Sequence, residues 1–180
     1  MNNNEIVIMY NPLGIYVSKD GRCFRGSVET SVMYDLQTIS LTEISPEKSD
    51  SGYKIILEKD LPNFNSFVNK PEEILIGGQK VRGQYVHKIV AFTFGDCKGR
   101  TRTKERCVID HLNMNTLDNR VSNLEYVSYG INLYRASVKA SDGPAKMACE
   151  KRYNDYFESL DSMKKYYLLM DIAADRQGEY

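Results

Sequence analysis

The sequence contains few cysteines and histidines, which limits the metal chemistry that it can support. Its four cysteines lie far apart, at Cys23, Cys97, Cys107 and Cys149. None belongs to a C-x-x-C pair, the spacing that is typical of structural zinc sites, so we expect no structural zinc. The only two histidines are His87 and His111. Any imidazole chemistry must therefore use one of these two side chains.

Long apolar runs are also missing. No stretch of 18 apolar residues occurs, and a membrane-spanning helix needs roughly 20. The N-terminal MNNNEIVIMY has no basic segment followed by a long apolar run, so it does not resemble a secretory signal. We therefore expect a cytoplasmic, reduced protein with no membrane partner.

An excess of charge of either sign is missing from the chain as a whole. With 24 basic and 24 acidic side chains the net charge is zero, which by itself argues against a nucleic-acid-binding protein. The distribution is uneven, however. Residues 1–75 hold seven Lys and Arg against eleven Asp and Glu, residues 141–180 hold six against eight, and residues 76–140 hold eleven against five. The middle segment is thus the part that would attract a phosphate backbone.

Local signals predict a β-rich N-terminal part. Asp20-Gly21 and Gly77-Gly78 each lie between strand-like runs, where the turns of β-hairpins are expected. After these, His87–Phe94 has apolar residues at the spacing of a short buried helix. The range 60–69 has turn residues between aromatics and is expected to be a loop.

A second group of elements is predicted from residue 107 onward. Two strands and a helix, with a long Asn-rich connection between the strands, are expected at Cys107–Ile109, Leu124–Val127 and Gly130–Lys139. Ser128 is a suitable N-cap for the helix, and Gly143-Pro144 marks a break after it. Apolar residues then recur at the spacing of a helical stripe, at Tyr153, Tyr156, Phe157, Leu160, Met163 and Tyr167. We expect a helical tail, with one helix beginning near Ser162.

The chemistry is concentrated in Asp110-His111, followed by Asn123 and Asn132 at intervals of twelve and nine residues. Hydrolysis of a phosphodiester requires that a water be deprotonated and that charge on the phosphorane and the leaving oxygen be stabilised. An imidazole suits the first task. A divalent metal suits the second, and Asp and Asn oxygens favour Mg²⁺ or Mn²⁺ over zinc.

The spacing also restricts the geometry. Consecutive residues of a strand point to opposite faces, so Asp110 and His111 can serve one phosphate only if the strand ends or bends between them. The loop that begins at Leu112-Asn113 is consistent with such an end. Asn132 falls in the early turns of the helix after Ser128, from which it can face back toward Asp110. These residues would then form a compact ββα unit.

Over residues 86–136 the chain resembles the HNH, or ββα-metal, endonucleases encoded by phages and mobile introns. The matching stretches are VHKIVAFTF, VIDH, NxxxNRVxNLEYVS and NLYRA, in that order. The resemblance implies that His111 is the general base, that Asp110 and Asn132 bind the metal, and that Asn123 supports the histidine and its loop. The third motif position, often His, is Asn132 here, a form known among phage nicking enzymes.

Other polar residues are candidates for binding DNA or for supporting the site. Arg120 either reaches a phosphate or pairs with Asp118. His87 has two alternative roles. It contacts DNA or the active site, or it is a structural histidine, and we favour the structural role. Asn119 is expected to be part of the scaffold. The remaining candidates for binding DNA are basic side chains: Lys98, Arg100, Arg102, Lys104, Arg106 and Arg135.

The sequence therefore predicts an α+β protein with three parts. A β-rich region over residues 1–85, a candidate DNA-binding element, precedes an HNH nuclease core over 86–140 and a helical tail over 141–180. The expected reaction is Mg²⁺- or Mn²⁺-dependent hydrolysis of double-stranded DNA, one strand at a time. The alternative is a DNA-binding protein of a phage or mobile element that keeps this scaffold without cleavage. A homodimer is not indicated, and the DNA target is left open.

Overall fold

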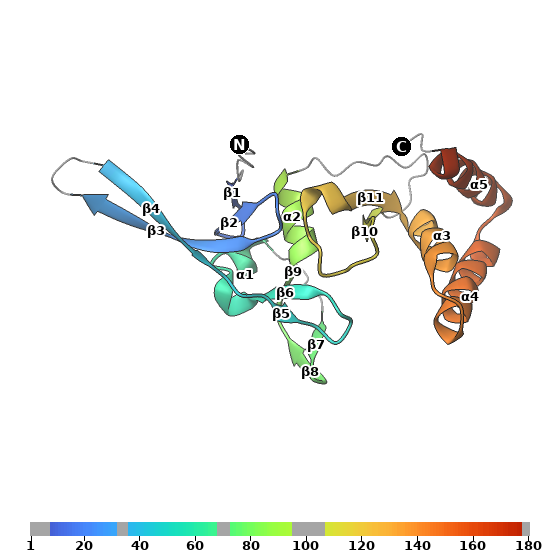
Figure 1. The fold of residues 1–180 in the computed structure, drawn as a ribbon, viewed down its shortest axis with the longest axis horizontal. Coiled ribbons are helices and arrows are strands. Elements are labelled where there is room, and N and C mark those ends of the chain that lie inside the picture. The colour runs from blue at the N-terminus through green and yellow to red at the C-terminus, as the bar shows by residue number, and fades with distance from the viewer. Residues whose placement is uncertain (1–7, 32–35, 68–72, 95–106, 178–180) are drawn as a thin grey trace. The chain divides into compact units, whose positions relative to one another are not determined.

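The structure, a computed structural model, describes residues 8–31, 36–67, 73–94 and 107–177. Strands occupy the N-terminal part and helices the C-terminal part (Figure 1), which confirms the predicted α+β class. The chain forms two compact units, one of Met1–Cys97 with His111–Leu124 and the other of Lys98–Asp110 with Glu125–Tyr180. None of the described helices is both long and apolar enough to cross a membrane.

The first unit begins with a four-stranded antiparallel sheet. Its strands pair in chain order and are β1 (Ile8–Asn11), β2 (Ile15–Ser18), β3 (Cys23–Ser31) and β4 (Leu36–Glu43). Ile15 and Val17 are fully buried, as alternate residues on one face of a strand are expected to be. Asp20-Gly21 lies between β2 and β3, and Gly21 has a φ of +87°, so the predicted hairpin turn is confirmed.

Smaller sheets complete this unit. A three-stranded sheet has the order β5 (Glu47–Lys48), β6 (Lys54–Leu57) and β9 (Gly83–Tyr85), and a separate hairpin pairs β7 (Ile74–Ile76) with β8 (Gln79–Val81). The turn at Gly77-Gly78 is confirmed, and the Asp50 carboxylate accepts hydrogen bonds from both glycine amides, at 2.7 and 2.9 Å.

Two helical segments lie between β6 and β7, where the sequence predicted a loop. They are the 3₁₀ turn η1 (Glu58–Asp60) and the short helix α1 (Phe64–Phe67). Leu61 and Phe64 are almost fully buried at 2% and 1% exposure. The two short helical segments place both apolar side chains in the interior, which the hydrophobic effect favours. The turn residues of the sequence do not indicate this burial.

Helix α2 (Val86–Phe94) forms the centre of the first unit and packs against β1, β2, β6 and β9. The helix predicted over His87–Phe94 is thereby confirmed. Ile89 and Val90 are buried at 1% and 0% exposure, whereas Phe92 is 59% exposed. The Asn11 side chain donates a hydrogen bond to the Thr93 hydroxyl, which ties the end of β1 to this helix.

The second unit contains three helices and most of a two-stranded sheet, of which only the end residues His111 and Leu124 belong to the first unit. The strands and helices are β10 (Cys107–His111), β11 (Leu124–Ser128), α3 (Tyr129–Lys139), α4 (Pro144–Ser159) and α5 (Ser162–Gln177), and the 3₁₀ turn η2 (Val121–Asn123) directly precedes β11. Ser128 Oγ accepts a hydrogen bond from the Ile131 amide at 3.2 Å, which confirms the predicted N-cap. The core joins Val127 and Ile131 to Leu168 and Ile172 of α5.

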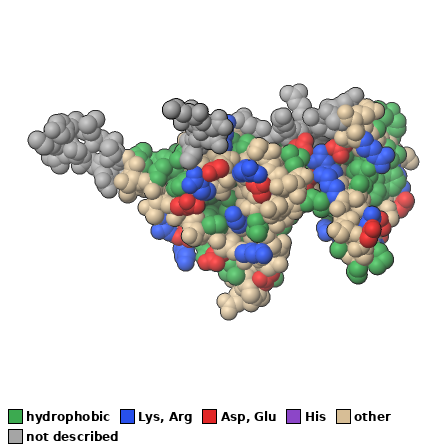
Figure 2. Space-filling view, in the orientation of Figure 1, with side chains coloured by type: hydrophobic (Ala, Val, Ile, Leu, Met, Phe, Trp, Pro, Cys, Tyr) green, Lys and Arg blue, Asp and Glu red, His purple; other side chains and the backbone are tan. Residues whose placement is uncertain are grey.

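The tail consists of two helices, with a break at Leu160-Asp161. A helix beginning at Ser162 is confirmed, but the single apolar stripe from Tyr153 to Tyr167 is not, because its two halves belong to different helices. The first half packs on the core, whereas Met163 of the second half is 62% exposed. Hydrophobic side chains are accordingly visible at the surface of the C-terminal helices in Figure 2.

Candidate active site

His111, the last residue of β10, is almost fully buried at 4% exposure. Its Nε2 lies 3.1 Å from the carboxamide Oδ1 of Asn119. Because Oδ1 can only accept, the hydrogen of the neutral ring lies on Nε2, and Nδ1 carries the lone pair. The residue expected to act as a base therefore has one defined basic nitrogen. Asn119, predicted to be scaffold, is the side chain that defines it.

Asn123 holds the loop that follows His111 rather than the imidazole itself. Its Oδ1 accepts from the Asn113 amide at 3.0 Å, and its Nδ2 donates to Asn113 Oδ1 at 2.9 Å and to the Asp118 carbonyl at 2.8 Å. Its backbone carbonyl accepts from the Leu112 amide at 2.9 Å. The side chain thus closes residues 112–123 into a fixed loop, in keeping with the loop-supporting part of its expected role.

The β2–β3 turn fixes the backbone beside Asn119. The Val121 amide donates to the Lys19 carbonyl at 2.9 Å. A Cβ added to Gly21 would lie 2.8 Å from the Asn119 carbonyl carbon and oxygen, closer than real side chains approach. Sequence reasoning found the Asp20-Gly21 turn but not its contact with this loop, because the two segments are about 100 residues apart.

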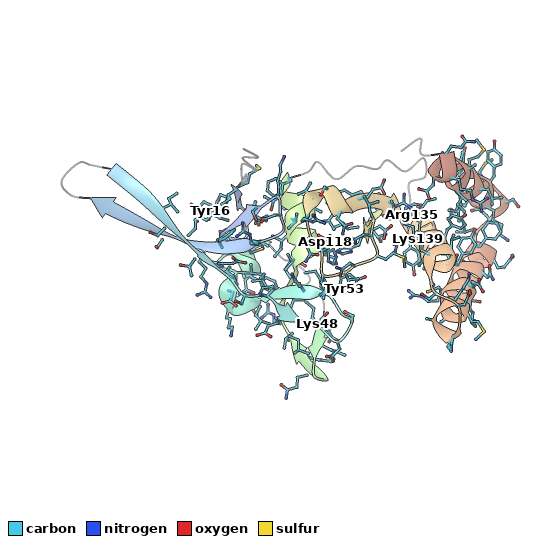
Figure 3. The ribbon with its side chains drawn as sticks, viewed as in Figure 1. Tyr16, Lys48, Tyr53, Asp118, Arg135 and Lys139 are labelled. Atoms are coloured by element: carbon cyan, nitrogen blue, oxygen red, sulfur yellow. The ribbon has the colours of Figure 1, made fainter. Side chains whose placement is uncertain are left out.

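His87 is buried beside His111 in a group of four rings. The His87 ring centroid lies 5.3 Å from that of His111, 5.4 Å from that of Tyr85 and 5.1 Å from that of Tyr53, which Figure 3 labels. Burial, followed by the influence of His111 and Lys88, lowers the pKa of His87 from 6.5 to about 3. His87 is therefore neutral at physiological pH and cannot supply a positive charge to a phosphate.

Asp118 and Arg120 form a close ion pair at the surface of the same loop. Arg120 Nε and Nη2 donate to the two Asp118 oxygens at 2.8 and 2.7 Å, and Asn113 Nδ2 donates to Asp118 at 2.8 Å. The side-chain hydrogen bond from Arg120 is the largest influence on Asp118. Together with the bond from Asn113, it lowers the pKa of Asp118 to about 2. The pairing with Asp118 that the sequence suggested is thus present, and the Arg120 side chain is 59% exposed.

Arg135 of α3, which Figure 3 labels, lies among three carboxylates of the second unit. It donates from Nη1 to Asp110 Oδ2 at 3.1 Å and to Glu125 Oε2 at 2.6 Å, and from Nε to Asp175 at 3.2 Å. Burial, the largest single influence, lowers the pKa of Arg135, but its hydrogen bonds to Asp175 and Glu125 outweigh burial and raise it. Only 11% of this side chain, which we expected to reach DNA, is exposed.

The donors near Asp110 suit a hard divalent cation. Three carboxylates surround the single guanidinium of Arg135, so the group has an excess of negative charge. Asn132 lies three residues before Arg135 on α3, and residues three apart are neighbours on a helix surface, so we expect its amide on the side of α3 from which Arg135 binds Asp110. Within the described ranges, no three His, Cys, Asp or Glu side chains could hold a metal by themselves. A site at Asp110 would therefore also use amide and water oxygens, as Mg²⁺ sites commonly do.

Five of the basic candidates fall outside the described residues. They are Lys98, Arg100, Arg102, Lys104 and Arg106. Their contribution to DNA binding stays a prediction from the sequence. The structure therefore describes Arg120 and Arg135 among the candidate DNA-binding side chains, and both are engaged with carboxylates.

Comparisons with known proteins find two similarities, one to a protein family and one to a solved structure. Residues 85–134 match the HNH endonuclease family. Among solved structures, the chain is similar to one described as "DNA binding and cleavage by the HNH homing endonuclease I-HmuI", with 19% sequence identity and a TM-score of 0.42 over 78% of this chain. The match spans 62% of that protein's chain, less than two thirds of it. A search of curated proteins finds no match. The segment that matches the HNH endonuclease family, residues 85–134, holds Asp110, His111, Asn123 and Asn132.

Proposed function

We propose that this protein is an endonuclease that hydrolyses DNA phosphodiester bonds with the help of a divalent cation, Mg²⁺ or Mn²⁺. The observation that carries the proposal is the contact between His111 Nε2 and Asn119 Oδ1, which leaves Nδ1 as the base at the end of β10. The preceding residue is Asp110, a carboxylate with a hard-oxygen neighbourhood. A buried base next to such a carboxylate suits the hydrolysis of a phosphodiester.

Each residue has a separate task in this proposal. His111 Nδ1 accepts the proton of the attacking water, while Asn119 holds the ring by its other nitrogen. Asp110 and Asn132 would hold the cation, which when bound supplies charge stabilisation to the phosphate and the leaving oxygen. Asn123 keeps the loop after His111 in place. One base serves one phosphodiester, so a single protein molecule should nick one strand of a duplex.

DNA binding is proposed to use the basic segment of residues 76–140 together with the β-rich region over 1–85. The segment has eleven basic against five acidic side chains, and electrostatic attraction to phosphates depends on such local excess. The compensated charges of Arg120 and Arg135 make Lys98, Arg100, Arg102, Lys104 and Arg106 the better candidates for phosphate contact.

Cleavage and its metal dependence test the proposal together. Supercoiled plasmids carrying random inserts are incubated with the protein and Mg²⁺ or Mn²⁺, and open-circular product is measured for wild type and His111→Ala. We expect wild type to nick, the variant to lose at least about 100-fold of the rate, and EDTA to abolish the product. DNA binding by wild type with no more nicking than His111→Ala would favour the alternative, a binding protein without cleavage.

The proposed role of Asp110 is tested without DNA. Mn²⁺ is titrated calorimetrically into wild type and Asp110→Asn, a variant that keeps an oxygen for Arg135 but removes the charge. Loss of measurable Mn²⁺ binding in the variant is the expected result. Equal affinities would remove Asp110 from the set of metal ligands.

A further inference from the structure

The two edges of the Arg135 guanidinium are held by different elements of the second unit. Asp175 of α5 binds the edge formed by Nε and Nη2, with both of its oxygens 3.2 Å from Nε. Nη1 is shared by Asp110 of β10 and Glu125 of β11. The exposed fractions of the three carboxylates are 14%, 16% and 8%. This is a largely buried network in which one side chain joins a strand pair to the C-terminal helix.

The planarity of the guanidinium links the two edges. A carboxylate that binds Nε and Nη2 fixes the plane of the group, and Nη1 then points in one direction only. That direction carries Nη1 to Oδ2 of Asp110, at 3.1 Å. Asp175 and Asp110, 65 residues apart in the chain, are thus joined through one guanidinium.

We propose that Arg135 and Asp175 are positioning residues for Asp110: helix α5 holds the guanidinium, and the guanidinium holds one Asp110 oxygen so that the other is directed to the cation. The inference rests on the proposed role of Asp110 as a metal ligand. It makes α5 part of the machinery of the nuclease domain, beyond the segment of residues 85–134 that matches the family.

The carboxylate of Asp175 also prevents Arg135 from competing with the cation. While Asp175 and Glu125 share the positive charge, Asp110 receives a single hydrogen bond from Nη1. Without Asp175 the Nε and Nη2 donors are unpaired in a buried place, and the guanidinium is free to turn both arms toward Asp110. A guanidinium that binds both oxygens of a carboxylate leaves neither for a metal.

The test is a calorimetric titration of Mn²⁺ into the full chain without DNA. Four variants are compared with wild type: Asp175→Asn, Arg135→Lys, the double variant, and Asp155→Asn as control. Asp155 pairs with Lys151 on the exposed surface of α4, so its substitution removes the same charge away from the network. Arg135→Lys keeps the charge but loses the planar fork.

We expect Asp175→Asn and Arg135→Lys each to weaken Mn²⁺ binding on the order of 10-fold, as loss of groups that orient metal ligands commonly does. The double variant should be no weaker than the single variants, because both act through the same contact. Asp155→Asn should bind as wild type does. Affinities of Asp175→Asn and Arg135→Lys within about twofold of wild type, or multiplicative losses in the double variant, would overturn the proposal.

Two outcomes separate this proposal from that of function. If Asp110→Asn binds Mn²⁺ as tightly as wild type, the metal role of Asp110 is wrong and the positioning role is wrong with it. If Asp110→Asn abolishes binding while Asp175→Asn and Arg135→Lys do not weaken it, only the positioning role is wrong. Circular dichroism verifies folding, and should Asp175→Asn unfold, Arg135→Lys decides the matter because it keeps the charge and the aliphatic stem.

Discussion

Asn119 Oδ1 lies 3.1 Å from His111 Nε2, and this contact makes Nδ1 the basic nitrogen of the ring. Removal of the acceptor frees both the tautomer and the orientation of the imidazole. We expect Asn119→Ala to lower kcat for nicking by about 10- to 100-fold, part of the effect that a positioned general base supplies.

Asn119→Asp is the matched variant, because it keeps an acceptor at the same position. It should retain a larger share of the wild-type kcat than Asn119→Ala does, as measured by single-turnover nicking of one plasmid substrate. If the two variants were equally impaired, acceptance of the Nε2 hydrogen would not be what Asn119 contributes.

A second prediction concerns the turn that lies against Asn119. Gly21 and Gly52 both have left-handed backbones, with φ of +87° and +88°, so the backbone conformation alone should make alanine cost roughly 1–2 kcal/mol at either position. Only at Gly21 would the new Cβ meet the Asn119 backbone, at 2.8 Å, whereas at Gly52 the nearest atom is Thr116 Oγ1 at 3.8 Å. Gly21→Ala should therefore lower kcat on the order of 10-fold or more, and Gly52→Ala should leave it within about twofold.

Thermal denaturation and nicking assays on the same preparations separate the two effects. Gly21→Ala should lose more stability than Gly52→Ala, because its Cβ also meets backbone atoms. At a temperature at which both variants are folded, the kcat of Gly21→Ala should still be the lower. Equal kcat values in Gly21→Ala and Gly52→Ala would show that the β2–β3 turn does not position the loop of Asn119.

The free energy of unfolding should depend on pH through the protonation of His87. The folded protein holds the pKa of His87 at about 3, below the value of 6.5 that applies to the unfolded chain. Between these values the unfolded chain binds a proton that the folded protein does not. The free energy of unfolding therefore falls as pH drops from 6.5 toward 3, by up to about 1.4 kcal/mol per pH unit from this group.

His87→Phe keeps a ring but removes the titration. Its free energy of unfolding at pH 7 will differ from wild type by an offset from repacking, roughly 1–3 kcal/mol, that does not depend on pH. The slope between pH 6 and pH 4 should be shallower than in wild type, as urea unfolding at several pH values measures. Parallel curves for the two proteins would mean that His87 is protonated equally easily in both states.

The amide of Asn123 should be required for the order of the loop after His111. Asn123→Asp keeps the oxygen that accepts from the Asn113 amide but replaces Nδ2, which donates to Asn113 and Asp118. In the variant, the Asn113 Oδ1 and the Asp118 carbonyl, which both accept hydrogen bonds, face a carboxylate oxygen instead of a donor. We therefore expect a loss of about 1–3 kcal/mol in the free energy of unfolding. Hydrogen exchange at the Asn113 amide should become faster.

Asn115→Ala provides the control in the same loop. Asn115 is exposed, and its Oδ1 accepts a single bond from the Leu117 amide at 3.1 Å. Its substitution should change stability by less than about 1 kcal/mol. If the two variants exchanged the Asn113 amide at the same rate, Asn123 would not be the residue that closes this loop.

Short-range features of the fold could be predicted from the sequence because their causes are local. The turns at Gly21 and Gly77-Gly78 depend on backbone conformations that glycine favours, and the start of α3 depends on the Ser128 hydroxyl. The apolar spacing of residues 87–94 was sufficient to predict α2. In each case the energetic reason lies within a few residues of the element.

Contacts between distant segments could not be predicted in this way. Arg135 and Asp175 are 40 residues apart, and no periodicity relates a basic side chain of one helix to an acidic side chain of another. The start of a helix near Ser162 was predicted, but the division of the apolar stripe by the break at Leu160-Asp161 was not, because the apolar spacing continues through it. Motif spacing was sufficient to nominate Asp110, His111 and Asn132, whereas the contacts of His111 with Asn119 and of Arg135 with Asp175 could not be predicted from it.

The chain passes between the two compact units three times, between Cys97 and Lys98, between Asp110 and His111, and between Leu124 and Glu125. The first unit is thus discontinuous in sequence: its last strip, His111–Leu124, follows a part of the second. A fragment that began at residue 86 to isolate the family-matching region would therefore lack the Gly21 turn against which Asn119 is seated. Expression boundaries for this protein should be chosen by three-dimensional unit, and a shortened chain should retain β2 and β3, whose turn contacts the loop that holds Asn119.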